Sequence, residues 1–566
     1  MSIVPEAFKK VPMMFQAQVD GRCQIQRLDS DKKKQGATQD CDRWADEWID
    51  KVDRQLPESR SGAQTRTFTF TWRLVSNSGV DDSVIRPVIG ARGYPYYPGS
   101  SMKGVFRRAC SSEQAARYCG KPLPGKDWEP GILRFHGGYP VNSDWTKGLV
   151  DLVHPQQGRQ VKDQSEKSSA FVQVSLYQPE MQFEISSTET LSEAEWESIW
   201  GIWAKAIAQG IGSRVCAGYG QPQLSGKVEA LYRVRLKGQG QAAKRIDESG
   251  EFRPNAFRAA IRGHAMRIFG GLTDERSTEQ MVDRLFGGIR DREGTTGLLM
   301  MRFQASNLVV KPFGRGAFAQ PAYEVEGELA WILTQPKLDE AEQKALRALI
   351  KALTQFAMVF GGFGKSWRRA DHRLFFGEYY EDSHKPLIGC HWQWLGEASL
   401  VNDVQVRKLD RVSEFIDKVR EAARDWMRLQ KIQPARPADW RESWHPGRVE
   451  VWGREASDRE DSEAIAWLHG AYQEKIAGVQ ERGSIYESSL TGGVGRIGRL
   501  WHRMYPVVGL RPPEKPGGKP IPKPTPRFLE VLTIFPDGSR ESEQFLRFLR
   551  ENQGTSRGFR RLWGGE

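Results

Sequence analysis

A run of hydroxyl and cationic side chains follows a proline turn in the segment GYPYYPGSSMKGVFRRAC, residues 93–110. Pro95, Pro98 and Gly99 predict an extended stretch that turns sharply into a helix. The side chains of this helix that could contact a phosphate are Ser100, Ser101, Lys103, Arg107 and Arg108. Free amides, hydroxyls and cations at a helix N-terminus favour anion binding. The simpler interpretation is a helix capped by its serines, with solvated basic residues.

A glycine-rich loop, GIGSRVCAGYG, follows the expected helix at residues 192–209. Its glycines would let backbone amides approach a ligand closely, its arginine adds charge, and its tyrosine could stack on a base. The residues that this hypothesis singles out are Gly210, Gly212, Arg214, Tyr219 and Gly220. One such loop is weak support for a binding site, and a second one elsewhere in the chain strengthens it.

The same order of features recurs in the second half of the chain: strand, proline turn, cationic helix, further strands, long helix and glycine-rich basic loop. Setting Pro98 against Pro254 aligns the two cationic helices, and the loop GGFGKSWRRADHR then matches the first loop. The second-copy residues expected to bind the same ligand are Arg258, Arg262, Gly362, Gly364, Lys365, Arg368 and Arg369. We interpret this as a duplication. Chance similarity is the alternative, because the identities are few.

Composition narrows the class of protein. A chain of 566 residues is expected to form two or three domains. Its 83 Lys and Arg against 71 Asp and Glu give a net charge of +12, which favours a polyanionic partner such as nucleic acid. The six cysteines include no C-x-x-C pair, which argues against a disulfide framework or a structural zinc site. Without a signal-peptide core or an apolar run of 18 residues, we expect a cytoplasmic protein with no membrane contact.

The segment YPYYPGSSMKGVFRR resembles the Pro-Gly-Ser-Ser-x-Lys-Gly-x-x-Arg signature of the RAMP superfamily, and the glycine-rich loop resembles its other hallmark. The likeness is specific at residues 72–107, good at 209–220, and looser to about residue 535. In the second half PNAFRAAIRG replaces the serines and one glycine, so the likeness there rests on order and charge. These proteins are RNA-binding backbone subunits of CRISPR type III effector complexes, which act in antiviral defence. A two-copy chain most resembles the fused backbone subunits of type III-D systems.

This resemblance implies an α+β fold of two tandem ferredoxin-like, RRM-related RAMP domains with insertions. The expected domains are residues 1–227, with an N-terminal insertion, and residues 228–540, followed by a basic tail at 541–566. Residues 390–500 are expected to be an insertion, although a third degenerate domain or a protein–protein interface fits them as well. The segment RPPEKPGGKPIPKPTP, residues 511–526, is expected to be a linker or an extended loop. The implied partners are guide RNA, target RNA and other type III effector subunits.

The resemblance also implies cleavage of the paired target RNA. Catalytic members carry an aspartate in a pattern like Asp-x-x-Val-Ile-Arg before the proline turn, and in GVDDSVIRP Asp81 holds that position, with Asp82 beside it. Asp247 lies in the corresponding loop of the second copy. Such a carboxylate would help a ribose 2′-hydroxyl attack the adjacent phosphate, with Mg²⁺ or Mn²⁺ as the metal. The alternative is an inactive backbone subunit in which these aspartates are solvated turn residues.

Overall fold

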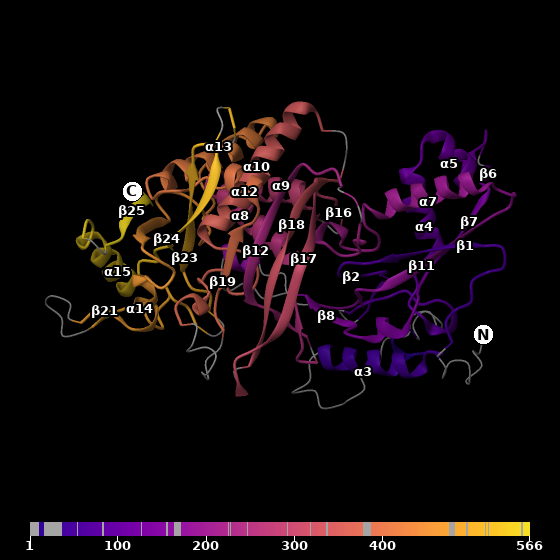
Figure 1. The fold of residues 1–566 in the computed structure, drawn as a ribbon, viewed down its shortest axis with the longest axis horizontal. Helices are drawn as coiled ribbons and strands as arrows, with labels where there is room; N and C mark the ends of the chain where they lie inside the picture. The colour runs from indigo at the N-terminus through magenta and orange to yellow at the C-terminus, as the bar shows by residue number, and fades with distance from the viewer. Residues whose placement is uncertain are drawn as a thin grey trace. The chain divides into compact units, whose positions relative to one another are not determined.

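The computed structural model describes residues 11–15 and 37–565 of the chain. Within that span it leaves out residues 54, 78, 82–83, 126, 154–156, 163–170, 225, 227, 246, 291–292, 317–318, 335–337, 377–386, 475–481, 494–495, 515–516, 519 and 556–557. The helices and the mostly antiparallel sheets in Figure 1 confirm the expected α+β class. In the described residues, no helix is both long enough and apolar enough to cross a membrane.

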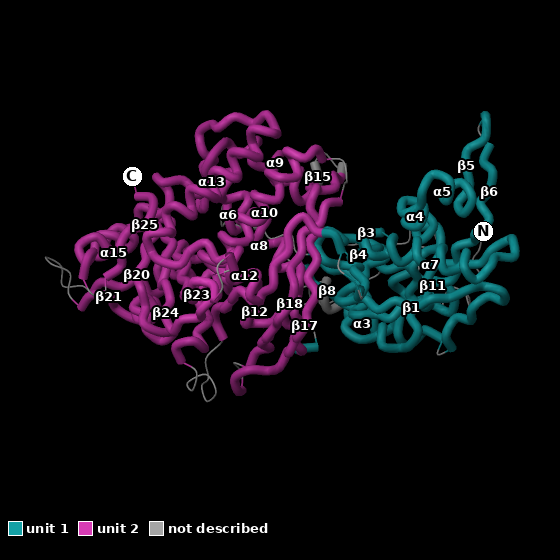
Figure 2. Tube along the Cα trace, turned by 45° about the horizontal axis from the view of Figure 1, so that its top comes forward, with its two compact units in different colours: residues 1–154, 169–229, 245–248 teal, residues 155–168, 230–244, 249–566 magenta. Residues whose placement is uncertain are grey.

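The chain divides into two compact units that interleave along the sequence (Figure 2). Unit 1 comprises residues 1–154, 169–229 and 245–248. Unit 2 comprises residues 155–168, 230–244 and 249–566. A short piece of sequence that lies between two parts of unit 1 therefore belongs to unit 2.

Unit 1 is built around an antiparallel sheet of order β1–β11–β7 (Gln64–Thr69, Glu180–Ser187 and Leu133–Pro140). Beyond β1, Phe70 forms a bridge with Pro222 at the open edge. A second sheet has the order β3–β4–β9–β8 (Gly79–Asp81, Val84–Arg86, Phe171–Val174 and Val150–Val153). Two ribbons complete the strands: β2 with β10 (Arg73–Leu74, Leu176–Tyr177) and β5 with β6 (Gly120–Pro122, Trp128–Pro130).

The helices of unit 1 are α3 (Ala37–Lys51), α4 (Gly99–Ala109), α5 (Ser112–Cys119) and α7 (Glu193–Ile207). Apolar residues at helical spacing place Met102 and Phe106 of α4 in the core, where neither is exposed. Trp203 of α7 lies with its ring 5.0 Å from that of Phe183 on the central strand. α4 and α7 therefore pack into the same core as the β1–β11–β7 sheet, which leaves the opposite side of α4 open.

Unit 2 contains a four-stranded antiparallel sheet of order β17–β18–β12–β19 (Leu299–Phe313, Gln320–Leu333, Tyr232–Gln241 and Cys390–Trp394). α8 (Asn255–Gly270) and α9 (Glu275–Phe286) follow the first of these strands in sequence, and α10 (Glu340–Phe360) follows the third. The first and third strands are thus central, and the second and fourth form the edges. This is a β-α-β-β-α-β arrangement, apart from the extra helix α9.

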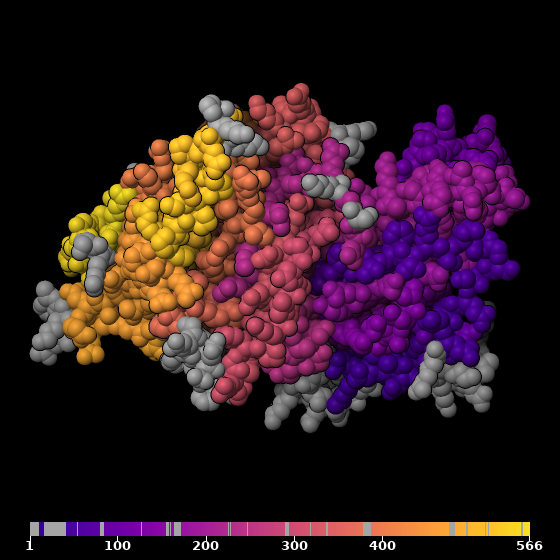
Figure 3. Space-filling view, in the orientation of Figure 1, coloured from indigo at the N-terminus to yellow at the C-terminus, as the bar shows by residue number. Residues whose placement is uncertain are grey.

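A second sheet of unit 2 repeats the same order with later strands. β20 (Glu450–Ala456) and β24 (Ile521–Ile534) are central, and β23 (Leu500–Arg511) and β25 (Arg560–Gly564) are the edges. α14 (Glu463–His469) follows β20, and α15 (Arg540–Glu551) follows β24. The expected tail at 541–566 is therefore wrong, because β25 pairs with β20. The yellow C-terminal residues accordingly lie against the orange part of unit 2 in Figure 3.

The expectation of a linker or an extended loop at residues 511–526 is wrong for its second part, since β23 ends at Arg511 but β24 already begins at Ile521. Pro522, Pro524 and Pro526 recur at every second position of β24. β24 pairs with β23 from Ile521 onwards but with β20 only from Phe528 onwards. Proline cannot donate a ladder hydrogen bond, so its use on an unpaired edge discourages pairing with another chain. Composition alone therefore suggested a loop where the structure has a strand.

The remaining elements of unit 2 precede the first sheet, lie between strands of one sheet in the chain, or lie between the two sheets. They are α6 (Gln157–Val161), β13 and β14 (Ala243–Lys244, Gly250–Glu251), β15 and β16 (Gly288–Arg290, Glu293–Thr295), α12 (Glu397–Asn402), α13 (Arg411–Leu429), and β21 and β22 (Ala471–Gln473, Gly483–Ser484). One hydrophobic core contains residues of both sheets together with Phe356 of α10 and Trp444, whose rings lie 4.7 Å apart, and Trp444 lies 5.7 Å from Trp501 of β23.

Candidate nucleic-acid interface

The N-terminal end of α4 is open rather than capped by a side chain. Pro98 occupies the N-cap position and makes no side-chain cap hydrogen bond, so the expectation that Ser100 and Ser101 cap the helix is wrong. Both serines are exposed, and neither hydroxyl forms a hydrogen bond to any residue that the structure describes. Gly99 is buried, and a Cβ there would collide with the carbonyl of Phe135 on β7. Close packing on β7 thus fixes this helix end with its hydroxyls facing solvent.

Lys103 and Arg108 are exposed on α4, whereas Arg107 is partly buried. Arg107 donates a hydrogen bond of 2.9 Å to the carbonyl of Gly120, and its guanidinium carbon lies 5.5 Å from the ring of Trp128. Arg107 is therefore held in place by the β5–β6 ribbon, while Lys103 and Arg108 retain the freedom to contact an anion.

Gly104 lies mid-way along α4, and no described atom lies within 4 Å of where its Cβ would be. Its backbone is helical, so neither packing nor a positive φ requires glycine here. Glycine costs about 1 kcal/mol relative to alanine inside a helix. A glycine at this position leaves a flat helix surface that a ligand can approach closely, which is a reason for the chain to have glycine and not alanine here. Sequence analysis did not single this glycine out.

Trp128 is the second feature that sequence analysis missed. Its side chain is 61% exposed, although tryptophan is usually well buried. It lies on β6, opposite Pro122, in a ribbon that extends beyond α5 in Figure 2. An exposed ring beside Arg107 suits the stacking of an unpaired base. Only its place beside the cationic helix reveals this, because the sequence contains 19 tryptophans.

The first glycine-rich loop is a compact turn that packs on its own chain. Cβ atoms at Gly212 and Gly220, both with positive φ, would collide with the carbonyls of Val75 and Ile211. Gly210 also has a positive φ, and a Cβ there would collide with the side chain of Val215. These glycines are thus explained by local packing. The fold requires them whether or not a ligand binds here.

Two side chains of this loop are not placed as expected. Tyr219 is buried, with its ring 4.3 Å from that of Trp72, and its hydroxyl donates to Asp151 at 3.0 Å. The prediction that Tyr219 stacks on a base is therefore wrong. Arg214 lies over the ring of Phe171 at 4.3 Å, and burial lowers its pKa.

The cations of the second helix, α8, are engaged by α9. Arg258 donates to the carbonyl of Phe286, and Arg262 lies 3.6 Å from the carboxylate of Asp283. Burial lowers the pKa of Arg262, against the opposing effect of Asp283. Both arginines of α8 are thus engaged by α9, as Arg107 of α4 is by the ribbon that follows α5, and their binding to a phosphate stays a prediction.

The second glycine-rich loop buries its arginines. Arg368 donates to Glu442 at 2.7 and 2.8 Å, and Arg267 of α8 pairs with the same carboxylate at 2.5 Å. Arg369 is enclosed and donates to the carbonyls of Leu500 and Thr491. Burial lowers the pKa of Arg369 to about 10. Arg368 and Arg369 thus make contacts within unit 2, and their role in RNA binding stays a prediction.

Lys365 is the cation of this loop that stays exposed. Partial burial of the ammonium group, and then the nearby Lys244, lower the pKa of Lys365. Gly362 and Gly364 have positive φ, and a Cβ at Gly362 would lie 2.7 Å from the ring of Trp392. Among the described residues of this loop, the exposed cation that could contact RNA is therefore a lysine and not an arginine.

The structure describes the three candidate catalytic aspartates to different extents. Asp81 ends β3, where its backbone pairs with Val84, and Asp82 lies outside the described residues. Asp247 is 58% exposed and lies 3.6 Å from Arg245. Nowhere in the described ranges do three or more His, Cys, Asp or Glu side chains gather as a metal site would require.

Comparisons with known proteins give little further guidance. No family model and no curated protein matches the chain. A chain of the type III-B Cmr-beta complex bound to cognate target RNA is 14% identical, covering 40% of this chain and 90% of that one, with a TM-score of 0.24. A chain of the same complex bound to target RNA and AMPPnP in the presence of single-stranded DNA is 9% identical, covering 57% and 99%, with a TM-score of 0.28. Likenesses this weak carry no argument.

Proposed function

We propose that this protein is an RNA-binding backbone subunit of a CRISPR type III effector complex. The observation that carries the proposal is the open face of α4. There, unengaged serine hydroxyls lie at the helix N-terminus, followed along the helix by Lys103, a bare glycine and, in the last turn, Arg108. The RAMP-like signature occupies the same residues.

In this proposal the sugar-phosphate backbone of the guide RNA runs along α4. Helix amides and the hydroxyls of Ser100 and Ser101 bind one phosphate, and Lys103 and Arg108 bind neighbouring phosphates. Gly104 lets the strand lie close to the helix, and Trp128 stacks on a base at the end of this path. Contacts of this kind position an RNA without reading its sequence, so the bases stay available for pairing with a target.

The repeated strand order supports the interpretation of unit 2 as ferredoxin-like modules. The sheet of β12, β17, β18 and β19 would be the second RAMP domain, and the sheet of β20, β23, β24 and β25 a third, degenerate one. The first domain would be the β1–β11–β7 sheet, with the Phe70–Pro222 bridge in the place of a fourth strand. We propose three such modules in place of the two expected from sequence.

Cleavage of target RNA by Asp81, Asp82 and Asp247, assisted by a divalent metal ion, is a further part of the proposal. Asp247 is exposed, as a residue that meets RNA must be. The alternative function is an inactive structural subunit, and the cleavage test below separates the two.

Guide binding is tested by purifying the effector complex with the variant Lys103→Glu/Arg108→Glu and measuring the RNA that copurifies. The control is Lys205→Glu/Lys344→Glu, which makes the same charge change at exposed lysines of α7 and α10. Loss of RNA in the first variant alone supports the proposal, and equal loss in both refutes it. Cleavage is tested separately with Asp81→Ala and Asp247→Ala. Loss of one discrete cut in each, with guide RNA retained, supports catalysis, and an unchanged cut pattern leaves the structural alternative.

A further inference from the structure

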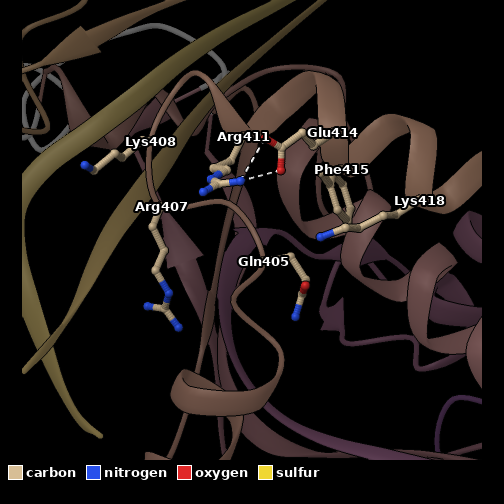
Figure 4. Close-up of a pocket in the computed structure, with 7 residues that line it drawn as sticks. All are labelled: Gln405, Arg407, Lys408, Arg411, Glu414, Phe415 and Lys418. Carbon is tan, nitrogen blue, oxygen red and sulfur yellow. Dashed lines mark hydrogen bonds and ion pairs between the residues drawn. The ribbon is translucent and has the colours of Figure 1, made fainter. Parts of the chain in front are cut away.

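A basic cavity lies in unit 2 at the start of α13, away from every residue used above. Its volume is about 380 Å³, within the range of roughly 300–1,000 Å³ for small-molecule sites. The lining residues are Gln405, Arg407, Lys408, Arg411, Glu414, Phe415 and Lys418. Figure 4 shows the last four on α13 and the first three on the loop that precedes it. Four of these side chains are cationic and one is a carboxylate.

Part of this charge is already used inside the protein. Arg407 donates to the carbonyls of Val508 at 2.7 Å and Leu400 at 2.9 Å, which fixes its guanidinium at the wall of the cavity. Arg411 pairs with Glu414, so their charges cancel. After the ion pair between Arg411 and Glu414 has formed, the other three cations of the lining still make the cavity wall positively charged.

Lys408 and Lys418 provide the unbalanced charge. Both are exposed, and neither pairs with a carboxylate in the part of the chain that the structure describes. Asp410, two residues after Lys408 in the sequence, forms an ion pair with Arg560 of β25. Two mobile ammonium groups beside a fixed guanidinium form a site for an anion that carries more than one charge.

The remaining lining favours an anion with an organic part. Phe415 is the apolar residue of the lining, although only 3% of it is exposed, and Gln405 uses its amide nitrogen to donate to the carbonyl of Asn402 at 3.2 Å. The amide oxygen of Gln405 is left to accept a hydrogen bond from a ligand. A nucleotide offers both parts, because its phosphate is charged and its base has an apolar face with donors at the edge.

We propose that this cavity binds a nucleotide phosphate, with Lys408 and Lys418 on the phosphate and Gln405 and Phe415 beside the base. The nucleotide could be free or part of an RNA strand, since the chemistry of recognition is the same. This proposal goes beyond the role of α4, and it stands whether or not α4 binds guide RNA.

The test uses the full-length chain, freed of nucleic acid, and three probes measured by calorimetry: AMP, adenosine and inorganic phosphate. AMP is expected to bind at least ten-fold more tightly than either of the others. Lys408→Glu/Lys418→Glu is expected to weaken AMP binding at least ten-fold, whereas the control Lys205→Glu/Lys344→Glu changes it less than two-fold. Equal effects of the two variants, or equal binding of a poly-glutamate peptide, would overturn the proposal.

A gain of affinity provides a second measurement that misfolding cannot mimic. Glu414→Gln removes the one carboxylate of the lining and releases Arg411, so AMP is expected to bind a few-fold more tightly. Unchanged or weaker binding of AMP by Glu414→Gln contradicts the proposed site.

A labelled 12-nucleotide single-stranded RNA shows whether the bound nucleotide is free or part of an RNA strand. If the site takes part of a strand, Lys408→Glu/Lys418→Glu lowers the slope of log affinity against log salt by about 1–2, as expected for the loss of up to two phosphate contacts. If RNA binding is unchanged while AMP binding is lost, the site takes a free nucleotide. Loss of neither overturns the proposal, whereas failure of the α4 variants alone would affect only the proposed guide binding.

Discussion

Gly104 and Gly201 offer a matched pair of helix glycines that separates stability from RNA binding. Gly104 lies in α4 and Gly201 in α7, and at each position an added Cβ would have no described atom within 4 Å. Replacing either by alanine removes conformational freedom from the unfolded chain without creating a clash. Each substitution is therefore expected to stabilise unit 1 by about 0.5–1 kcal/mol.

This stabilisation corresponds to a rise of about 1–4 °C in the midpoint of the thermal transition of unit 1. Differential scanning calorimetry of Gly104→Ala and Gly201→Ala measures it, and both variants should behave alike. RNA binding should differ, because only α4 faces the proposed strand. A methyl group at residue 104 pushes the strand away from the helix, so we expect a loss of about ten-fold, or about 1.4 kcal/mol.

Fluorescence anisotropy with a labelled single-stranded RNA reads this difference, with Gly201→Ala as the control. If Gly104→Ala binds RNA as tightly as the wild-type protein, the close approach of RNA to α4 is refuted. If Gly104→Ala also fails to raise the transition midpoint, the open geometry of this helix face is refuted as well.

Four further outcomes follow from other parts of the structure. Trp128→Ala should weaken single-stranded RNA binding by about 1–3 kcal/mol while Trp128→Phe retains most of it, and equal losses in anisotropy would exclude stacking. Glu442→Gln should destabilise unit 2 by about 3–5 kcal/mol in urea denaturation, because it leaves buried guanidinium groups unpaired. Burial alone would raise the pKa of Glu442, but its arginine partners lower the pKa overall. Unit 2 should therefore lose stability as the pH falls below about 4.5, the pKa of this carboxyl in the unfolded chain. A free energy of unfolding that does not change over this pH range would contradict the prediction. Val161→Ala should cost about 2 kcal/mol and raise amide hydrogen exchange in α8 but not in β1.

Local sequence signals predicted the elements that carry the proposed interface, and long-range contacts decided what was missed. The serines, lysine and arginines of α4 follow from helical spacing, and the structure leaves most of them exposed. Arg368 carries the same kind of local signal, yet it is neutralised by Glu442, which lies 74 residues further along the chain. No local pattern in a single sequence indicates such a pairing.

The same limit explains the misassigned C-terminal region. The prolines of β24 are typical of a loop, and only its pairing with β23 makes them part of a strand, in the stretch of β24 that β20 does not pair with. Tyr219 likewise lies in a glycine-rich loop typical of ligand binding, but Trp72 and Asp151 enclose it. Elements defined by periodicity were predictable, whereas burial of a polar side chain depends on partners that are distant in sequence.

The placement of α6 in unit 2 has a consequence for synthesis on the ribosome. Val161 is fully buried in the core of unit 2, and its carbonyl accepts a hydrogen bond of 3.0 Å from the amide of Glu442. That amide emerges roughly 280 residues later, which at about 5–20 residues per second is about 15–55 s. During this interval the nascent chain carries Val161 without the complete core into which it packs. Translation of unit 2 thus begins before that of unit 1 is finished. A pause or a premature stop after residue 229 leaves α6 without the core into which it packs.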